Sequence, residues 1–127
     1  MPLSTSKSPF IADLPLADQS VLDVVSKSHK GQIVQSVLSA TVNLEEGYLF
    51  VTDASVLFYR SVRDGWKMSL DVKLAAILDV ATRGGFSGDN LSIHHTEGWV
   101  QIKNLIKGKG LYLESILTKK ASSSKNI

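Results

Sequence analysis

The middle of the chain carries the clearest pattern of apolar and polar positions. Two short runs rich in aromatic and β-branched residues, 48–51 and 56–59, flank the group 52–55, whose short polar side chains can bond their own backbone in a turn. This arrangement predicts a β-hairpin. After a second turn group at 63–65, large apolar and polar residues alternate strictly through 66–70, which predicts a third strand with one buried face. The residues expected on that face are Trp66, Met68 and Leu70.

The residues before this hairpin predict a short helix followed by a strand. The helix is expected at 19–29, with Asp18 as its cap and Gly31 as its stop. Its apolar face would consist of Val21, Leu22, Val24 and Val25. Residues 32–44 fit a helix or a strand, and β-branching together with the hairpin that follows favours a strand from at least Val37. Residues 45–47, Glu-Glu-Gly, are expected to form a tight turn into the hairpin.

The residues after the third strand predict three more strands and a final helix. Residues 71–75 are expected to form a turn or a single helical turn before a strand at 77–82, in which Leu78 and Val80 take the apolar positions. Two further strands are expected at 91–95 and 99–103. A helix at 111–120 has an apolar face and lysines in its last turn, where the helix dipole favours cations. The apolar face consists of Leu113, Ile116 and Leu117.

These elements predict a mainly β (α+β) fold. Seven antiparallel strands would curl into a partly open barrel, and an amphipathic C-terminal helix could cap one open end. The helix at 19–29 would be an N-terminal extension. A single domain at 18–120 is expected, preceded by a flexible arm at 1–17 and followed by a disordered tail at 121–127. The arm carries four apolar residues that would dock on the domain or bind a partner: Phe10, Ile11, Leu14 and Leu16.

Composition narrows the possible chemistry. The chain has 127 residues and no cysteine, which excludes disulfides and thiol chemistry and indicates a reducing compartment. No apolar run is long enough to span a bilayer, and the N-terminus lacks the apolar core of a signal peptide, so a cytoplasmic protein is expected. A net charge of +2 is too small to indicate nucleic acid as a partner.

Several strings resemble the pleckstrin-homology-like superfamily, especially its GRAM and bacterial PH-like branches. Those families carry a string of the type G-x-L-x-h-T-[DN]-x-x-h-h-F. The matching residues here are Gly47, Leu49, Val51, Thr52, Asp53, Val56, Leu57 and Phe58. The strand at 66–70, the later string from Leu91 to Gly98 and the final helix resemble the family as well. The resemblance covers residues from about Val37 to Lys120.

The resemblance implies a binding module without catalysis. Some members of the superfamily hold phosphoinositide head groups in a basic pocket, and others bind peptides or assemble with partners. Members that bind phosphoinositides place lysines and arginines in the first two strands and the loop between them, whereas this chain has Glu45 and Glu46 there. Two carboxylates would repel a phosphate, so any anionic-lipid site would have to lie elsewhere.

Candidate binding residues fall into two groups. A Lys/Arg patch for an anionic head group or an acidic peptide could form if the second hairpin and the segment before the last helix came together. Its residues would be Arg60, Arg63, Lys67, Lys103, Lys107 and Lys109. Trp99, next to a turn, is expected to be exposed for a partner, with the apolar residues of the arm. Adjacent His94 and His95 face opposite sides of a strand and cannot easily share one metal.

The expected function is protein–protein interaction or self-assembly, because exposed sheet edges can accept a strand from another chain. Peripheral binding to an anionic membrane lipid through the Lys/Arg patch is the alternative. No catalytic residue, metal ligand or cofactor is predicted, since no catalytic or phosphate-binding motif is present.

Overall fold

The computed structural model describes Leu14 and residues 18–86 and 88–125. In this part of the chain two α-helices and seven strands follow one another with a single 3₁₀ turn, η4, between the fourth and fifth strands. The elements are α1 (Ser20–Ser28), β1 (Val34–Val42), β2 (Glu45–Thr52), β3 (Ser55–Val62), β4 (Gly65–Lys73), η4 (Leu74–Ala76), β5 (Ile77–Gly84), β6 (Asp89–His95), β7 (Gly98–Leu105) and α2 (Lys109–Lys125). The predicted fold class is confirmed.

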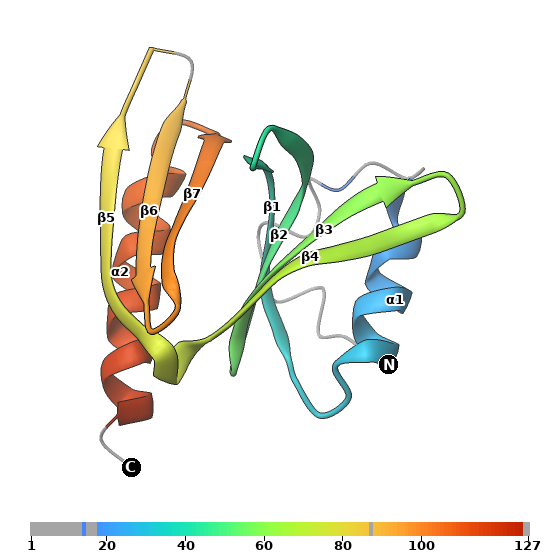
Figure 1. Cartoon of the computed structure of the whole chain (residues 1–127), viewed down its shortest axis with the longest axis horizontal. Coiled ribbons are helices and arrows are strands. Elements are labelled where there is room, and N and C mark those ends of the chain that lie inside the picture. Colours follow the sequence, from blue (N-terminus) through green and yellow to red (C-terminus); the bar gives the residue numbers. More distant parts are fainter. Residues whose placement is uncertain (1–13, 15–17, 87, 126–127) are drawn as a thin grey trace.

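All neighbouring strands pair antiparallel, in the order β4-β3-β2-β1-β7-β6-β5. β1 and β7 share only two residue pairs, Thr41 with Lys103 and Val42 with Ile102. The sheet therefore divides into two parts, β1–β4 and β5–β7, which Figure 1 shows side by side with α2 behind β5–β7 and α1 beside β1–β4. The ends of the sheet order, β4 and β5, are edge strands.

The main core lies between the two parts of the sheet and α2. Leu113, Leu117 and Ala121 of α2 pack into it against buried residues of the strands. This helix closes the barrel as predicted, because its one apolar face removes the open end of the core from water. It also continues to Lys125, beyond the predicted end at Lys120, so the expected tail at 121–127 is helical over most of its length.

A second buried cluster lies on the opposite face of β1–β3 and is covered by α1. Val21 and Val25 of α1 pack there with Phe50, Leu57 and Tyr59. Since β2 and β3 are thus buried on both faces, their central residues form continuous apolar runs in place of an alternating pattern. The N-terminal helix is an integral layer of the domain.

The predicted turn at 45–47 is wrong. β1 and β2 are joined by a two-residue turn at Asn43 and Leu44, with φ of 52° and 66°, and Val42 pairs directly with Glu45. Residues 45–47 continue β2. Such a hairpin turn requires the left-handed backbone region, which asparagine tolerates and leucine rarely adopts. The prediction relied on Gly47 as the turn signal and therefore placed the turn too late in the chain. The Leu44 side chain is 95% exposed.

The predicted single buried face of β4 is also wrong. Tyr59 pairs with Met68 and Phe58 pairs with Leu70, so Ser69 is an extra residue in a β-bulge. Because a bulge reverses the side-chain alternation, Leu70 packs against the main core while Trp66 packs against the second cluster. Met68 is 40% exposed.

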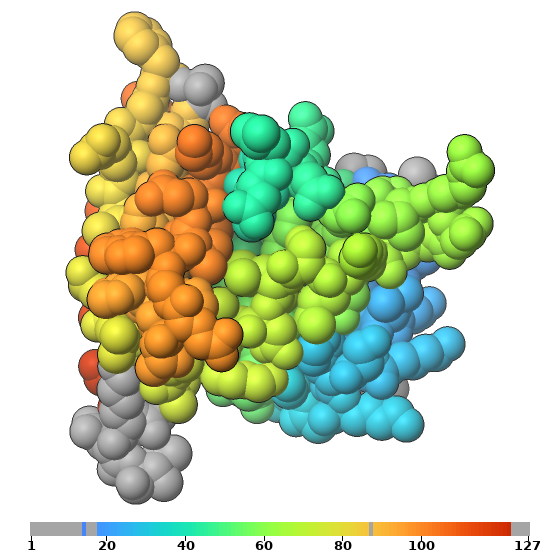
Figure 2. All heavy atoms as spheres, viewed as in Figure 1, coloured from blue at the N-terminus to red at the C-terminus, as the bar shows by residue number. Residues whose placement is uncertain are grey.

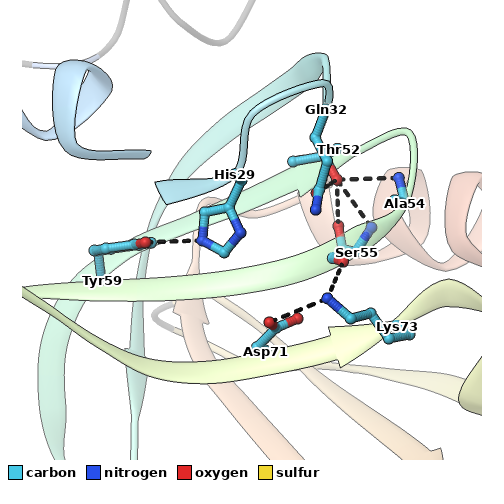
Figure 3. A network of polar contacts seen from close by, with 8 residues as sticks. All are labelled: His29, Gln32, Thr52, Ala54, Ser55, Tyr59, Asp71 and Lys73. Atoms are coloured by element: carbon cyan, nitrogen blue, oxygen red, sulfur yellow. Dashed lines mark hydrogen bonds and ion pairs between the residues drawn. The ribbon is translucent and has the colours of Figure 1, made fainter. Parts of the chain in front are cut away.

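The Thr52-Asp53 pair of the family-like string stabilises the β2–β3 turn, and Figure 3 shows the contacts of Thr52. Thr52 is fully buried, and its Oγ1 accepts hydrogen bonds from the backbone N–H groups of Ala54 (3.0 Å) and Ser55 (2.9 Å). The same hydroxyl lies 2.7 Å from Gln32 Oε1, to which it donates. Asp53 Oδ1 accepts the Ile33 N–H at 2.9 Å. The pair therefore fixes a turn and ties the segment before β1 to it.

The predicted cap of α1 is wrong as well. The N-cap position belongs to Gln19, which makes no side-chain capping hydrogen bond. The Asp18 carboxylate instead accepts a hydrogen bond from the Tyr48 hydroxyl on β2. A long-range partner thus outcompetes the local backbone N–H groups, and α1 is tied to the sheet at its first turn.

This contact predicts a loss of stability in alkali. Burial, followed by the hydrogen bond to Asp18 and its charge, raises the pKa of Tyr48 from 10.0 to about 12. A raised folded-state pKa stabilises the fold below the unfolded value, and this contribution disappears as the pH rises from 10 to 12. The urea midpoint of the wild type should fall more steeply between about pH 10 and pH 12 than that of Tyr48→Phe. Parallel curves for the two proteins would contradict the assignment.

Candidate functional site

β5 presents a free edge with an exposed apolar side chain. Its ladder runs only with β6, and its other side has no strand partner among the described residues. Ile77 pairs with His95 and Asp79 pairs with His94, so Leu78 is an extra residue in a bulge. The Leu78 side chain is 52% exposed.

The sequence pattern placed Leu78 in the core, and this prediction is wrong. The expected alternation paired Leu78 with Val80 on the buried face. The bulge shifts the alternation by one residue, so that Ile77 and Val80 are buried and Leu78 turns outward. A bulge depends on the strand opposite, and no local signal in β5 indicates it.

A groove separates this part of β5 from the second half of α2. Its water-accessible volume is about 90 Å³. The lining residues are Ile77, Leu78, Asp79, Val80, Thr118, Ala121 and Ser122. An edge strand offers unpaired backbone N–H and C=O groups, and a groove beside it can hold side chains of an added strand. The arrangement suits an extended peptide segment.

The position of α2 beside β5 depends on Asp89 of β6. The Asp89 side chain is buried, and its Oδ2 accepts the backbone N–H groups of Gly108 (2.7 Å) and Gly110 (2.9 Å). Thr82 of β5 donates its hydroxyl hydrogen to the Gly110 carbonyl oxygen at 3.0 Å. A carboxylate at a helix N-terminus is favoured by the helix dipole. The glycine-punctuated segment thus holds a carboxylate of the protein itself, which fixes the start of α2 beside β5 and β6.

Trp99 is exposed, as the sequence indicates. It opposes His94 on β6, and the two rings stack with centroids 4.4 Å apart and planes 6° apart. The indole is 60% exposed. This stack lies on the outer face of β6–β7, away from the core, and neither of its two rings lines the β5 groove.

The six predicted cationic residues do not form one patch. Arg60 and Lys67 oppose each other on β3 and β4, and Arg60 Nε lies 3.0 Å from Glu45 Oε2. Arg63 lies in the turn between these strands. The other three lie on β7, in the link after it and at the start of α2, and Figure 1 shows the β3–β4 turn and α2 at opposite ends of the longest axis. The second group consists of Lys103, Lys107 and Lys109.

The structure places only one of the four apolar residues of the N-terminal arm. Leu14 is buried in the second cluster, against α1 and β1–β3. Phe10, Ile11 and Leu16 lie outside the described residues. Leu14 therefore docks on its own domain, which was one of the two roles expected for the arm.

No protein-family model and no curated protein matches the chain. Among solved structures, the C-terminal domain of an unknown protein from Leishmania infantum is similar, with 14% identity and a TM-score of 0.63 over 81% of this chain and 96% of that one. A structure with the PH and C1 domains of the Vav1 exchange factor gives 13% identity and a TM-score of 0.47, over 84% of this chain and 33% of that one. The first similarity shows a shared fold. Across the described residues, neither helix combines the length and apolar character needed to cross a bilayer.

Proposed function

We propose that the chain is a non-enzymatic binding module of the pleckstrin-homology-like type. It recognises an extended segment of another protein, or of a second copy of itself, by strand addition along β5. The seven antiparallel strands and the terminal helix are those that the sequence resemblance implies. The observation that carries the proposal is the free edge of β5 with Leu78 exposed beside the groove to α2.

Strand addition fits this edge for physical reasons. A partner strand would satisfy the backbone groups of β5, which supplies affinity that does not depend on sequence. Burying the exposed part of Leu78 and the groove would add an apolar contribution and favour a partner with an apolar side chain at that level. By contrast, the dispersed cations and the ion pair of Arg60 with Glu45 give an anionic membrane less to bind.

Peptide selection tests this function. Random peptides displayed on phage would be selected on the full chain, and the binders titrated against wild type, Leu78→Arg and Trp99→Ala. Leu78→Arg should weaken binding at least about tenfold, because it removes the apolar side chain that the partner would bury and places a charge at this edge, while Trp99→Ala should leave it unchanged. Both substitutions are at exposed positions, so folding should persist.

Light scattering coupled to size-exclusion chromatography completes this test. A dimer that becomes monomeric in Leu78→Arg would identify a second copy as the partner of β5. Peptides that lose binding only in Trp99→Ala would contradict the β5 site and move the function to the outer face of β6–β7. A monomer that selects no peptide would contradict strand addition altogether.

A further inference from the structure

A larger groove lies on the outer face of β1–β4, in a different part of the fold from the β5 edge. Its water-accessible volume is about 310 Å³. The lining residues are Asp18, Ser39, Glu46, Gly47, Tyr48, Ser61 and Trp66. They come from all four strands of this part of the sheet and from Asp18, two residues before the start of α1, so the groove is formed only in the folded domain.

Two aromatic rings form a corner in this groove. The centroids of Tyr48 and Trp66 lie 5.9 Å apart and their planes meet at 55°. Each ring is held by its polar atom, since the Tyr48 hydroxyl donates to Asp18 and Trp66 Nε1 donates to Ser20 Oγ at 2.9 Å. The polar ends of both rings are thus occupied toward α1, and the π-systems contribute to the groove wall.

The charge of the groove is negative. Its lining includes the carboxylates of Asp18 and Glu46 and no lysine or arginine. Within the described part of the chain, the ion pairs join Arg60 to Glu45 and Lys73 to Asp71, so neither groove carboxylate takes part in one. The Tyr48 phenol, with its pKa raised to about 12, stays neutral at physiological pH. A ligand here would meet two carboxylates and two electron-rich ring faces.

We propose that this groove binds the cationic side chain of a lysine or arginine on a partner protein. Ring faces attract ammonium and guanidinium groups through the ring quadrupole, and a carboxylate within reach adds a charge-assisted hydrogen bond. The methylene stem of such a side chain packs against indole and phenol surfaces, which a hydrated metal ion cannot do. Glu46 is the exposed carboxylate that contributes the pairing charge, since Asp18 already accepts from Tyr48.

NMR titration of the full chain tests the proposal directly. The probes are short glycine-serine peptides that carry one central lysine, arginine or norleucine, with methylammonium chloride as a fourth probe. The lysine and arginine peptides should shift the Trp66 indole N–H and the Tyr48 amide saturably, with a Kd in the millimolar range. The norleucine peptide should leave these two signals unshifted, because its side chain has an apolar stem like that of lysine but no charge.

Two variants make the test specific. Glu46→Gln removes the exposed carboxylate and should weaken the binding of the lysine peptide at least about fivefold. Added salt should weaken the binding of this peptide to the wild type as well. Glu97→Gln, an exposed acid in the β6–β7 turn, is the matched control and should bind as the wild type does. Equal shifts with norleucine, equal binding of methylammonium and the lysine peptide, or an unchanged affinity in Glu46→Gln would each overturn the proposal. The readout is independent of Leu78, so the β5 function can fail without affecting it.

Discussion

Replacing Asp89 with alanine is expected to lower the free energy of unfolding by about 2–4 kcal/mol and to loosen the start of α2. The buried carboxylate binds two backbone N–H groups, those of Gly108 and Gly110, which no other described residue is seen to satisfy. Alanine would leave the buried Gly110 N–H unpaired and remove the charged acceptor of the exposed Gly108 N–H, and the first loss exceeds the net value of an ordinary hydrogen bond. Urea unfolding and hydrogen exchange of the α2 amides would measure the two effects.

Matched variants separate the charge from the acceptor. Asp89→Asn keeps an oxygen that can accept hydrogen bonds from the two N–H groups, but it loses the favourable charge at the helix N-terminus. It should therefore lower the free energy of unfolding by about half as much as Asp89→Ala does. Asp79→Asn, at an exposed position on β5, should change stability by less than about 0.5 kcal/mol. If Asp89→Ala were as stable as Asp79→Asn, the carboxylate would not hold the helix.

Replacing Gly47 with alanine is expected to lower the free energy of unfolding by about 2–3 kcal/mol. A Cβ atom at this position would lie 2.3 Å from the Tyr59 backbone oxygen and 2.8 Å from Phe58 Cζ. The backbone oxygen cannot move without shifting β3, and Phe58 is fully buried in the main core. The glycine of the family-like string is thus required by the close approach of β2 and β3. Chemical unfolding of Gly47→Ala gives the measurement.

Gly84→Ala is the matched control for this strand glycine. Its Cβ atom would come no closer than 3.7 Å to Asp89 Oδ1, and its φ lies outside the left-handed region. The control should therefore stay within about 0.5 kcal/mol of the wild type. A Gly47→Ala protein that unfolds at the same urea concentration as Gly84→Ala would show that β2 and β3 can separate without cost.

Much of the fold was predictable because its signals are local. The apolar runs of β2 and β3, the short polar residues between them and the helical spacing of Val21 and Val25 each act within a few residues. From these signals, seven strands and two helices are predicted in the correct order. The exposure of Trp99, which lies next to the turn between β6 and β7, is also predicted from a local signal.

The errors arose where two distant segments meet. The bulges at Ser69 and Leu78 each reverse the alternation of an edge strand, and each exists because of the strand opposite. Asp18 was expected to cap α1, and its partner is Tyr48 on β2. The sequence allowed the cations at the β3–β4 turn and those before α2 to meet, yet the barrel holds them apart. Figure 2 shows the face that lies between the β3–β4 hairpin and β5–β7.

The amino-acid sequence by itself determined the kind and order of the elements, because periodicity and turn chemistry act through the backbone of each segment. Only the tertiary structure decided which side chains became accessible for binding. Leu78 is exposed by a bulge, the start of α2 is held by the buried Asp89, and the aromatic groove joins Asp18 to four strands. Each of these features depends on contacts between residues far apart in the chain, whose geometry is fixed only when the strands and helices pack together.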